Sequence, residues 1–131
     1  MSEAPGSRWQ KAPVWLAVAL YMAAVFALSA QPRLPNLGRY GIRDWMQHYV
    51  EYVGLGALTA KAAAVTWPVL SGAGCGGFAI AFGAIYGLSD EIHQKYVPGR
   101  SCDRRDWVAD FLGAVSGACV FLAWRRFRKR G

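Results

Sequence analysis

The residues best able to do chemistry gather between Gly87 and Gly117, in a polar stretch that is flanked by two strongly apolar segments. Two acids, a histidine and a glutamine lie within about one helical turn of one another at positions 90–94. Arg100 follows a Pro-Gly turn, and further acids open the next apolar segment. Polar side chains at membrane depth are costly and by default mark a functional site. We therefore predict a polar site here, held in place by the apolar segments around it.

A second polar group precedes that stretch. Asp44, His48 and Glu51 are spaced by four and three residues, so they share one face of a helix. Because lipid would reject such a face, we expect it to point into the protein. We predict that the acids of both groups converge around Arg100 at the outer membrane interface. The candidate ligand-binding residues are Asp44, His48, Glu51, Asp90, Glu91, Gln94, Arg100, Asp106 and Asp110.

Four apolar segments must position these side chains. About 20 apolar residues in a helix cross the hydrocarbon core of a bilayer, since each adds about 1.5 Å. The six tryptophans lie at or near the segment ends, as in interfacial aromatic belts, and Gly-x-x-x-Gly pairs favour close helix packing. The sequence therefore predicts an all-α fold, an integral membrane four-helix bundle. Its helices are expected at residues 14–30, about 44–65, about 69–88 and 106–124.

The distribution of charge predicts the topology of this bundle. Fifteen Lys and Arg against eight Asp and Glu give a formal net charge of +7. The basic residues lie at segment ends and in a short tail, which indicates membrane orientation and argues against nucleic-acid binding. We expect a multi-pass protein of the inner (plasma) membrane with both termini cytoplasmic and the 31–43 and 89–105 loops outside. Residues 1–12 are expected as a short lead, 13–124 as the four-helix domain and 125–131 as a basic tail.

The three cysteines indicate neither a disulfide framework nor a zinc site, because their number is odd, their spacing is wide and no CxxC occurs. Cys75 and Cys119 fall in apolar segments, where cysteine usually acts as a small hydrophobic residue. Cys102 and His93 are expected in the loop. No motif indicates a cofactor, so we predict no cofactor and no resident metal.

Several ordered motifs resemble the signature of VanZ-like membrane proteins. They are Ser89-Asp90-Glu91-Ile92-His93-Gln94, Val97-Pro98-Gly99-Arg100, and Asp106-Trp107-Val108-Ala109-Asp110 with Gly113. The run from Asp44 through His48 to Tyr52 resembles that family's upstream acid–histidine–tyrosine motif. The family typically has Asn in place of Asp110 and Lys in place of Trp45. The resemblance covers about residues 14–124 and implies a small four-helix membrane protein of the cell envelope.

Three interpretations of the polar site remain open. In the first, the site is structural: Arg100 pairs with Glu91 or Asp106, and acids stabilise the helix ends. In the second, it recognises a membrane lipid or a lipid-linked cell-wall intermediate, whose phosphate would bind Arg100 with Arg104 or Arg105. The resemblance adds a link to the glycopeptide teicoplanin, since the family is named for a protein associated with low-level teicoplanin resistance.

In the third interpretation, the protein is a membrane hydrolase or transferase that acts on a lipid phosphate. Paired titratable groups in a dry pocket suit acid–base catalysis, and Asp and His side chains could also hold a divalent metal. The catalytic candidates are His48, Glu51, Glu91 and Asp106. The chain has no HExxH or GxSxG motif, and recognition of an amphiphilic ligand is the function that we favour.

Overall fold

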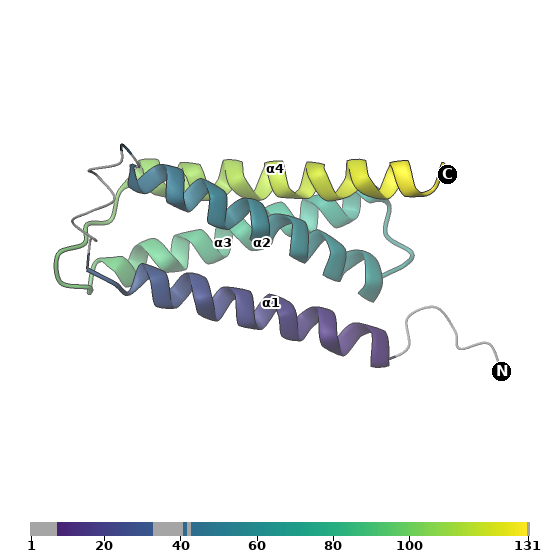
Figure 1. The fold of residues 1–131 in the computed structure, drawn as a ribbon, viewed down its shortest axis with the longest axis horizontal. Coiled ribbons are helices and arrows are strands. Elements are labelled where there is room, and N and C mark those ends of the chain that lie inside the picture. The colour runs from purple at the N-terminus through teal and green to yellow at the C-terminus, as the bar shows by residue number, and fades with distance from the viewer. Residues whose placement is uncertain (1–7, 33–40, 42, 131) are drawn as a thin grey trace.

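Four helices make up the part of the chain that the computed structural model describes, which is residues 8–32, 41 and 43–130, and this part contains no strand (Figure 1). The helices are α1 (Arg8–Ser29), α2 (Asp44–Thr66), α3 (Gly72–Gln94) and α4 (Arg104–Arg128). The predicted all-α four-helix fold is confirmed. Most of the predicted 31–43 loop lies outside the described residues.

The helix bounds differ from the predicted ones, and the most informative difference is at the end of α3. The sequence prediction ended this helix near Leu88, but it continues to Gln94, so that positions 89–94 are helical and not a loop. The polar residues of its last turns are buried against the other helices, which removes the reason to leave the helix before Pro98. Likewise α1 starts inside the expected lead, at Arg8, and α4 extends into the expected basic tail, to Arg128.

Side-chain caps define the starts of α3 and α4. The Ser71 hydroxyl accepts a hydrogen bond from the Gly74 backbone N–H at 3.1 Å and so starts α3 after the Trp67-Pro68 turn. The Asp103 carboxylate accepts from the Arg105 backbone N–H at 2.9 Å and so starts α4. Ser and Asp are favoured at this position because they satisfy N–H groups that lack a partner inside the helix.

Three of the four helices are long and apolar enough to cross a membrane, namely Lys11–Ser29, Gly72–Gln94 and Arg104–Arg128. The second helix is of similar length but is not among them, and it carries charged residues such as Glu51 and Lys61 along its length. It packs against all three other helices, most extensively against α4. Such shielding from lipid lets α2 carry polar side chains that an exposed helix would not tolerate.

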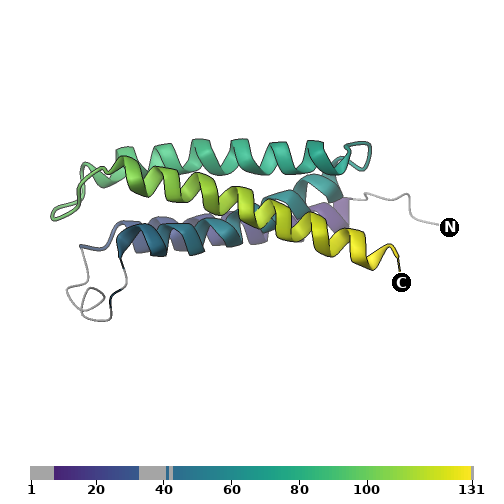
Figure 2. The same ribbon diagram turned by 90° about the horizontal axis from the view of Figure 1, so that it is seen from above.

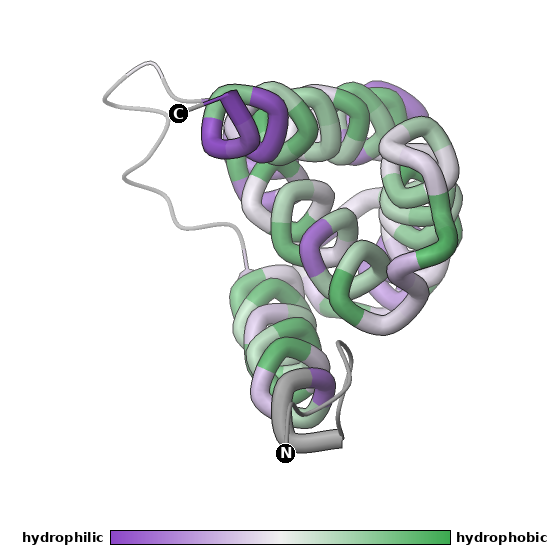
Figure 3. The backbone as a smooth tube through the Cα atoms, turned by 90° about the vertical axis from the view of Figure 1, so that its right-hand side faces the viewer, coloured by the Kyte–Doolittle hydropathy of each residue, from purple (hydrophilic) through white to green (hydrophobic). Residues whose placement is uncertain are grey.

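Successive helices run in opposite directions (Figure 1, Figure 2). Each end of the bundle therefore collects its own set of helix ends. The start of α1 and the end of α4 lie at one end, where hydrophilic residues gather on α4 (Figure 3). The start of α2, the end of α3 and the start of α4 meet at the other end. This arrangement alone brings both predicted polar groups to the same place.

Glycines let α2 and α4 approach until their backbones touch. A Cβ atom built on Gly113 or Gly117 of α4 would lie less than 3.0 Å from backbone atoms of α2, and one on Gly56 of α2 would meet the backbone of α4 in the same way. On α3, Gly83 and Gly87 face Ala114 and Asp110 of α4. The Gly-x-x-x-Gly pairs thus serve contacts within the bundle, as small residues do in membrane proteins.

We expect Gly117→Val to destabilise the protein, because its side chain would collide with the carbonyl of Val53 and the amide of Ala57. Overpacking of this kind typically costs about 1–3 kcal/mol, and more where only backbone can move. Thermal unfolding in detergent should show a clearly lower transition temperature. The matched control is Gly77→Val, which puts the same residue into a helix where nothing lies within 4 Å of the added Cβ. Equal stability of the two variants would contradict the close α2–α4 contact.

Candidate functional site

A buried histidine–aspartate pair joins α2 to α4. His48 Nδ1 lies 2.9 Å from Asp110 Oδ1, and the two residues are only 4% and 0% exposed. With Nδ1 donating to the carboxylate, the other ring nitrogen of His48 is left as an acceptor facing the Gln94 side-chain amide, 3.5 Å away. The aspartate therefore fixes both the orientation and the tautomer of the ring.

The last turns of α3 surround this pair with further buried polar groups. The Gln94 amide donates to Asp90 Oδ2 at 3.1 Å and to the Ser29 hydroxyl of α1 at 3.1 Å. Glu91 Oε2 accepts from the backbone N–H of Asp103 at 3.0 Å. We call the five side chains of His48, Asp90, Glu91, Gln94 and Asp110 the polar cluster.

The polar cluster contains more acceptors than donors. Four of its oxygens are buried without a hydrogen-bond partner among the described residues: Asp90 Oδ1, Glu91 Oε1, Gln94 Oε1 and Asp110 Oδ2. Nearly all buried polar atoms in proteins are paired, so each exception calls for a physical explanation. What these oxygens lack is positive charge or a donated proton.

Arg100 does not supply that charge by direct contact. Its guanidinium donates to the backbone carbonyls of Gln31, at 3.0 Å, and Leu28, at 3.4 Å, where α1 ends. Leu28 carries one of the last carbonyls of α1, and Gln31 lies just beyond the end of the helix, so Arg100 binds the backbone at the C-terminal end of α1. The prediction that the acids converge around Arg100 is replaced by a cluster in which three carboxylates gather around His48.

The other predicted residues lie near the cluster but make different contacts. Glu51 is half-buried and accepts from the Gln47 amide at 2.9 Å, one turn earlier on α2. Asp106 is buried in the first turn of α4, one turn before Asp110. Asp44 is half-buried in the first turn of α2. Helix periodicity thus identified an inward face for His48, but it could not say which acid bonds the ring, and that acid comes from α4.

The candidate residues predicted from the sequence omit Tyr52 and Ser29, although Tyr52 stands in the acid–histidine–tyrosine motif. Tyr52 is fully buried, and its hydroxyl finds no partner among the described residues. Its position one helical turn after His48 is a signal that could have found it. Ser29, the last residue of α1, joins the cluster through Gln94. No pattern in the sequence marks Ser29, because the contact depends on how α1 docks.

His93 and Cys102 take no part in the cluster. His93 is helical and half-buried, contrary to the loop position predicted for it, and its ring stacks on Phe26 of α1 with a centroid distance of 4.3 Å. Cys102 is exposed in the loop before α4. Desolvation of the sulfur and the nearby Glu91 carboxylate raise the pKa of the Cys102 thiol, so it is not an activated nucleophile.

One combination of cluster atoms has the geometry for a metal ion. His48, Glu91 and Asp110 each offer one ligand atom, and these atoms lie within 4.8 Å of one another. We predicted no resident metal from the sequence, and no motif groups these three residues, which come from three different helices. Their proximity follows from the antiparallel order of the helices and the close α2–α4 contact.

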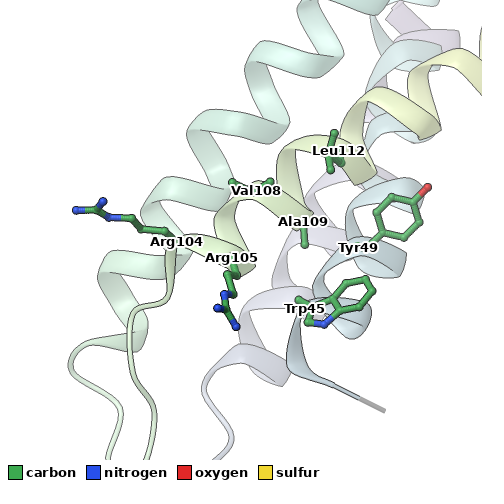
Figure 4. A pocket seen from close by; sticks show the side chains of 7 residues that line it. All are labelled: Trp45, Tyr49, Arg104, Arg105, Val108, Ala109 and Leu112. Atoms are coloured by element: carbon green, nitrogen blue, oxygen red, sulfur yellow. The ribbon is translucent and has the colours of Figure 1, made fainter. Parts of the chain in front are cut away.

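A groove on the outside of the α2–α4 pair adjoins the cluster (Figure 4). Its volume is about 510 Å³, and it is lined by Trp45, Tyr49, Arg104, Arg105, Val108, Ala109 and Leu112. Trp45, Val108 and Leu112 remain largely exposed, which is unusual for large apolar side chains in a soluble protein but normal against lipid. Arg104 and Arg105 extend in different directions from the start of α4 (Figure 4). We call this feature the α2–α4 groove.

We expect His48→Ala to destabilise the protein strongly, because it leaves the buried Asp110 carboxylate without its donor. Removing one partner of a buried pair typically costs about 3–5 kcal/mol, whereas removing both costs less than the two single changes together. The measurement is a double-mutant cycle of His48→Ala and Asp110→Ala, in which the stability of each variant is measured by thermal unfolding in detergent. Additive losses in the cycle would show that the two side chains do not interact.

Comparison with protein families identifies the fold. Residues 14–125 match the VanZ/LLP1 family, which is most of the chain and includes all residues of the polar cluster. No curated protein and no solved structure matches the chain. The family match, the four-helix architecture and the three apolar helices agree with one another. The chain is therefore a membrane protein that belongs to the VanZ/LLP1 family.

Proposed function

We propose that this protein recognises an amphiphile with a phosphate head group, either a membrane lipid or a lipid-linked cell-wall intermediate, at the outer membrane interface. The observation that carries the proposal is the α2–α4 groove, which joins apolar walls to two arginines at the start of α4. An acyl chain would lie against Val108 and Leu112. The phosphate would meet Arg105 or Arg104.

The chemistry of the groove suits such a ligand. A guanidinium group can bind a phosphate through two parallel hydrogen bonds, and it remains charged in every membrane environment. Trp45 and Tyr49 give the groove aromatic side chains, whose apolar body and polar tip favour the membrane interface. A volume of about 510 Å³ lies within the usual range for ligand pockets, which is roughly 300–1,000 Å³.

The basic residues support an orientation with the groove in the outer leaflet. The end of α4 carries Arg125, Arg126 and Arg128, and such runs are retained on the cytoplasmic side. Since the start of α1 lies at the same end of the bundle, both termini are cytoplasmic in our proposal (Figure 1). The protein is then a multi-pass protein of the inner (plasma) membrane, and an altered susceptibility to teicoplanin would follow from its contact with an envelope precursor.

A membrane hydrolase or transferase is the second candidate. The observation that favours it is the His48–Asp110 pair, in which a buried carboxylate orients an imidazole as it does in many general bases. The pair is covered in this structure, and the groove lies on adjoining residues, since Tyr49 follows His48 and Ala109 precedes Asp110. Release of phosphate from the bound amphiphile would favour this candidate over recognition alone.

The proposed orientation predicts that reporters fused to either end of the chain will behave as cytoplasmic. Alkaline phosphatase, which is active only outside the cytoplasm, should be inactive at both ends, and green fluorescent protein should fluoresce at both. A phosphatase inserted after Gly99, in the exposed turn between α3 and α4, is the matched control and should be active. Activity at either terminus would contradict the orientation.

The groove predicts selective retention of an anionic lipid. We expect native mass spectrometry of the detergent-solubilised protein to show bound phosphatidic acid in preference to phosphatidylcholine. Loss of a charged hydrogen-bonding partner costs about 1.5–3 kcal/mol, so Arg104→Gln with Arg105→Gln should weaken phosphatidic acid binding by about tenfold or more.

A second pair of variants tests the apolar wall. Leu112→Trp should fill the groove and exclude the lipid, whereas Val120→Trp adds the same side chain to an exposed position of α4 outside the groove and should leave binding unchanged. Equal retention of both lipids by the unmodified chain, or equal effects of the two tryptophan variants, would rule out the α2–α4 groove as the binding site.

A further inference from the structure

We propose that the polar cluster binds one divalent transition-metal ion, with His48, Glu91 and Asp110 as its protein ligands. The site is separate from the α2–α4 groove and does not depend on the lipid recognition proposed above. Each ligand comes from a different helix, since His48 lies on α2, Glu91 on α3 and Asp110 on α4. An ion at this place would tie the three helices together at one end of the bundle.

The distances between the candidate ligand atoms are close to those of a formed site. Oxygen and nitrogen ligands lie about 2.0–2.2 Å from a zinc ion, so two ligands of one ion are at most about 4.4 Å apart. The three atoms offered by His48, Glu91 and Asp110 lie within 4.8 Å of one another. Small side-chain movements are therefore enough to close the site, and no helix has to shift.

Unpaired oxygens provide independent support for a cation. Glu91 Oε1 and Asp110 Oδ2 accept no hydrogen bond from any described residue, although Glu91 is 2% and Asp110 0% exposed. Asp90 Oδ1 and Gln94 Oε1 are in the same condition and flank the three ligands. Leaving carboxylate oxygens buried without a partner is costly, and a bound cation removes that cost for several of them at once.

Neighbouring groups hold two of the ligands in place, as the outer shell of a metal site does. The backbone N–H of Asp103 fixes one oxygen of Glu91 and leaves the other unpaired. The Gln94 amide is in turn oriented by Asp90 and Ser29, and it faces the ring of His48. At Glu91 the hydrogen bond thus leaves the second oxygen for the ion. At His48 one ring nitrogen bonds Asp110 and the other faces Gln94, so the imidazole exchanges one of these two contacts for the ion.

The ligand set indicates which class of ion would bind. One imidazole nitrogen with two carboxylate oxygens suits Mn²⁺, Fe²⁺ or Zn²⁺, whereas Mg²⁺ and Ca²⁺ prefer oxygen ligands alone and Cu⁺ prefers sulfur. Three protein ligands leave at least one coordination position for water or for an oxygen of another molecule. The competing explanation is that protons alone neutralise the carboxylates.

The test measures binding of Mn²⁺ and of Zn²⁺, in separate experiments, to the full chain in nanodiscs made of neutral phosphatidylcholine. We expect about one ion per chain after gel filtration, above the level of empty nanodiscs. His48→Gln, Glu91→Gln and Asp110→Asn should each reduce binding by about tenfold or more. The matched controls His93→Gln and Glu51→Gln change the same residue types outside the three ligands and should keep the ion.

A second measurement on the unmodified chain guards against variants that fail to fold. A ligand that binds only the native state raises its stability, so Mn²⁺ or Zn²⁺ should raise the transition temperature of the unmodified chain. Less than about a tenth of an ion per chain, together with no metal-dependent rise in that temperature, would overturn the proposal and leave protons as the neutralising species. Full binding by the three ligand variants would also overturn it.

Discussion

The balance of charge at one dry end of the bundle is the constraint on which the rest of this structure depends. Within the polar cluster at that end, three carboxylates surround a single imidazole, and four of the cluster's oxygens find no partner among the described residues. Such a cluster of carboxylates can stay buried only under two conditions: the backbone must hold its side chains tightly, and a bound cation or protons must neutralise the excess negative charge. The close α2–α4 contact meets the first requirement. If α2 faced the lipid, neither requirement would be met, which is why this helix lies against the other three.

Much of this architecture could be predicted from the sequence. The four apolar segments gave the number and order of the helices, and alternating direction then placed His48 and the 90–110 acids at one end. The spacing from Asp44 to Glu51 correctly indicated an inward face of α2. These predictions depend on periodicity and chain direction, which a single sequence contains.

The pairing inside the site could not be predicted in the same way. Asp110 was one of nine candidates, and nothing in the sequence marks it as the partner of His48 across a separation of 62 residues. Arg100 was predicted to meet carboxylates, but its guanidinium donates to the backbone carbonyls of Gln31 and Leu28 at the end of α1. The predicted end of α3 came too early, because polar residues in a membrane sequence resemble a loop until their burial is known. Each of these errors concerns contacts between helices, which depend on how the helices rotate and dock.

The attachment of α1 has a consequence for how the protein must be handled. Unlike α2 and α4, which meet through backbone, α1 is attached through side chains. Val25 packs in a buried cluster with Tyr52 and Leu55, and Arg100 donates to the Leu28 carbonyl. Single hydrogen bonds join Trp15 to Thr66, Tyr21 to the Glu51 carbonyl, Tyr86 to the Met22 carbonyl and Gln94 to Ser29. Such bonds contribute only about 0.6 kcal/mol each on average within a bilayer, and water competes for them directly. The first helix is therefore the part of the bundle most sensitive to its solvent, and a detergent that admits water will loosen α1 before it disturbs the glycine-packed pair.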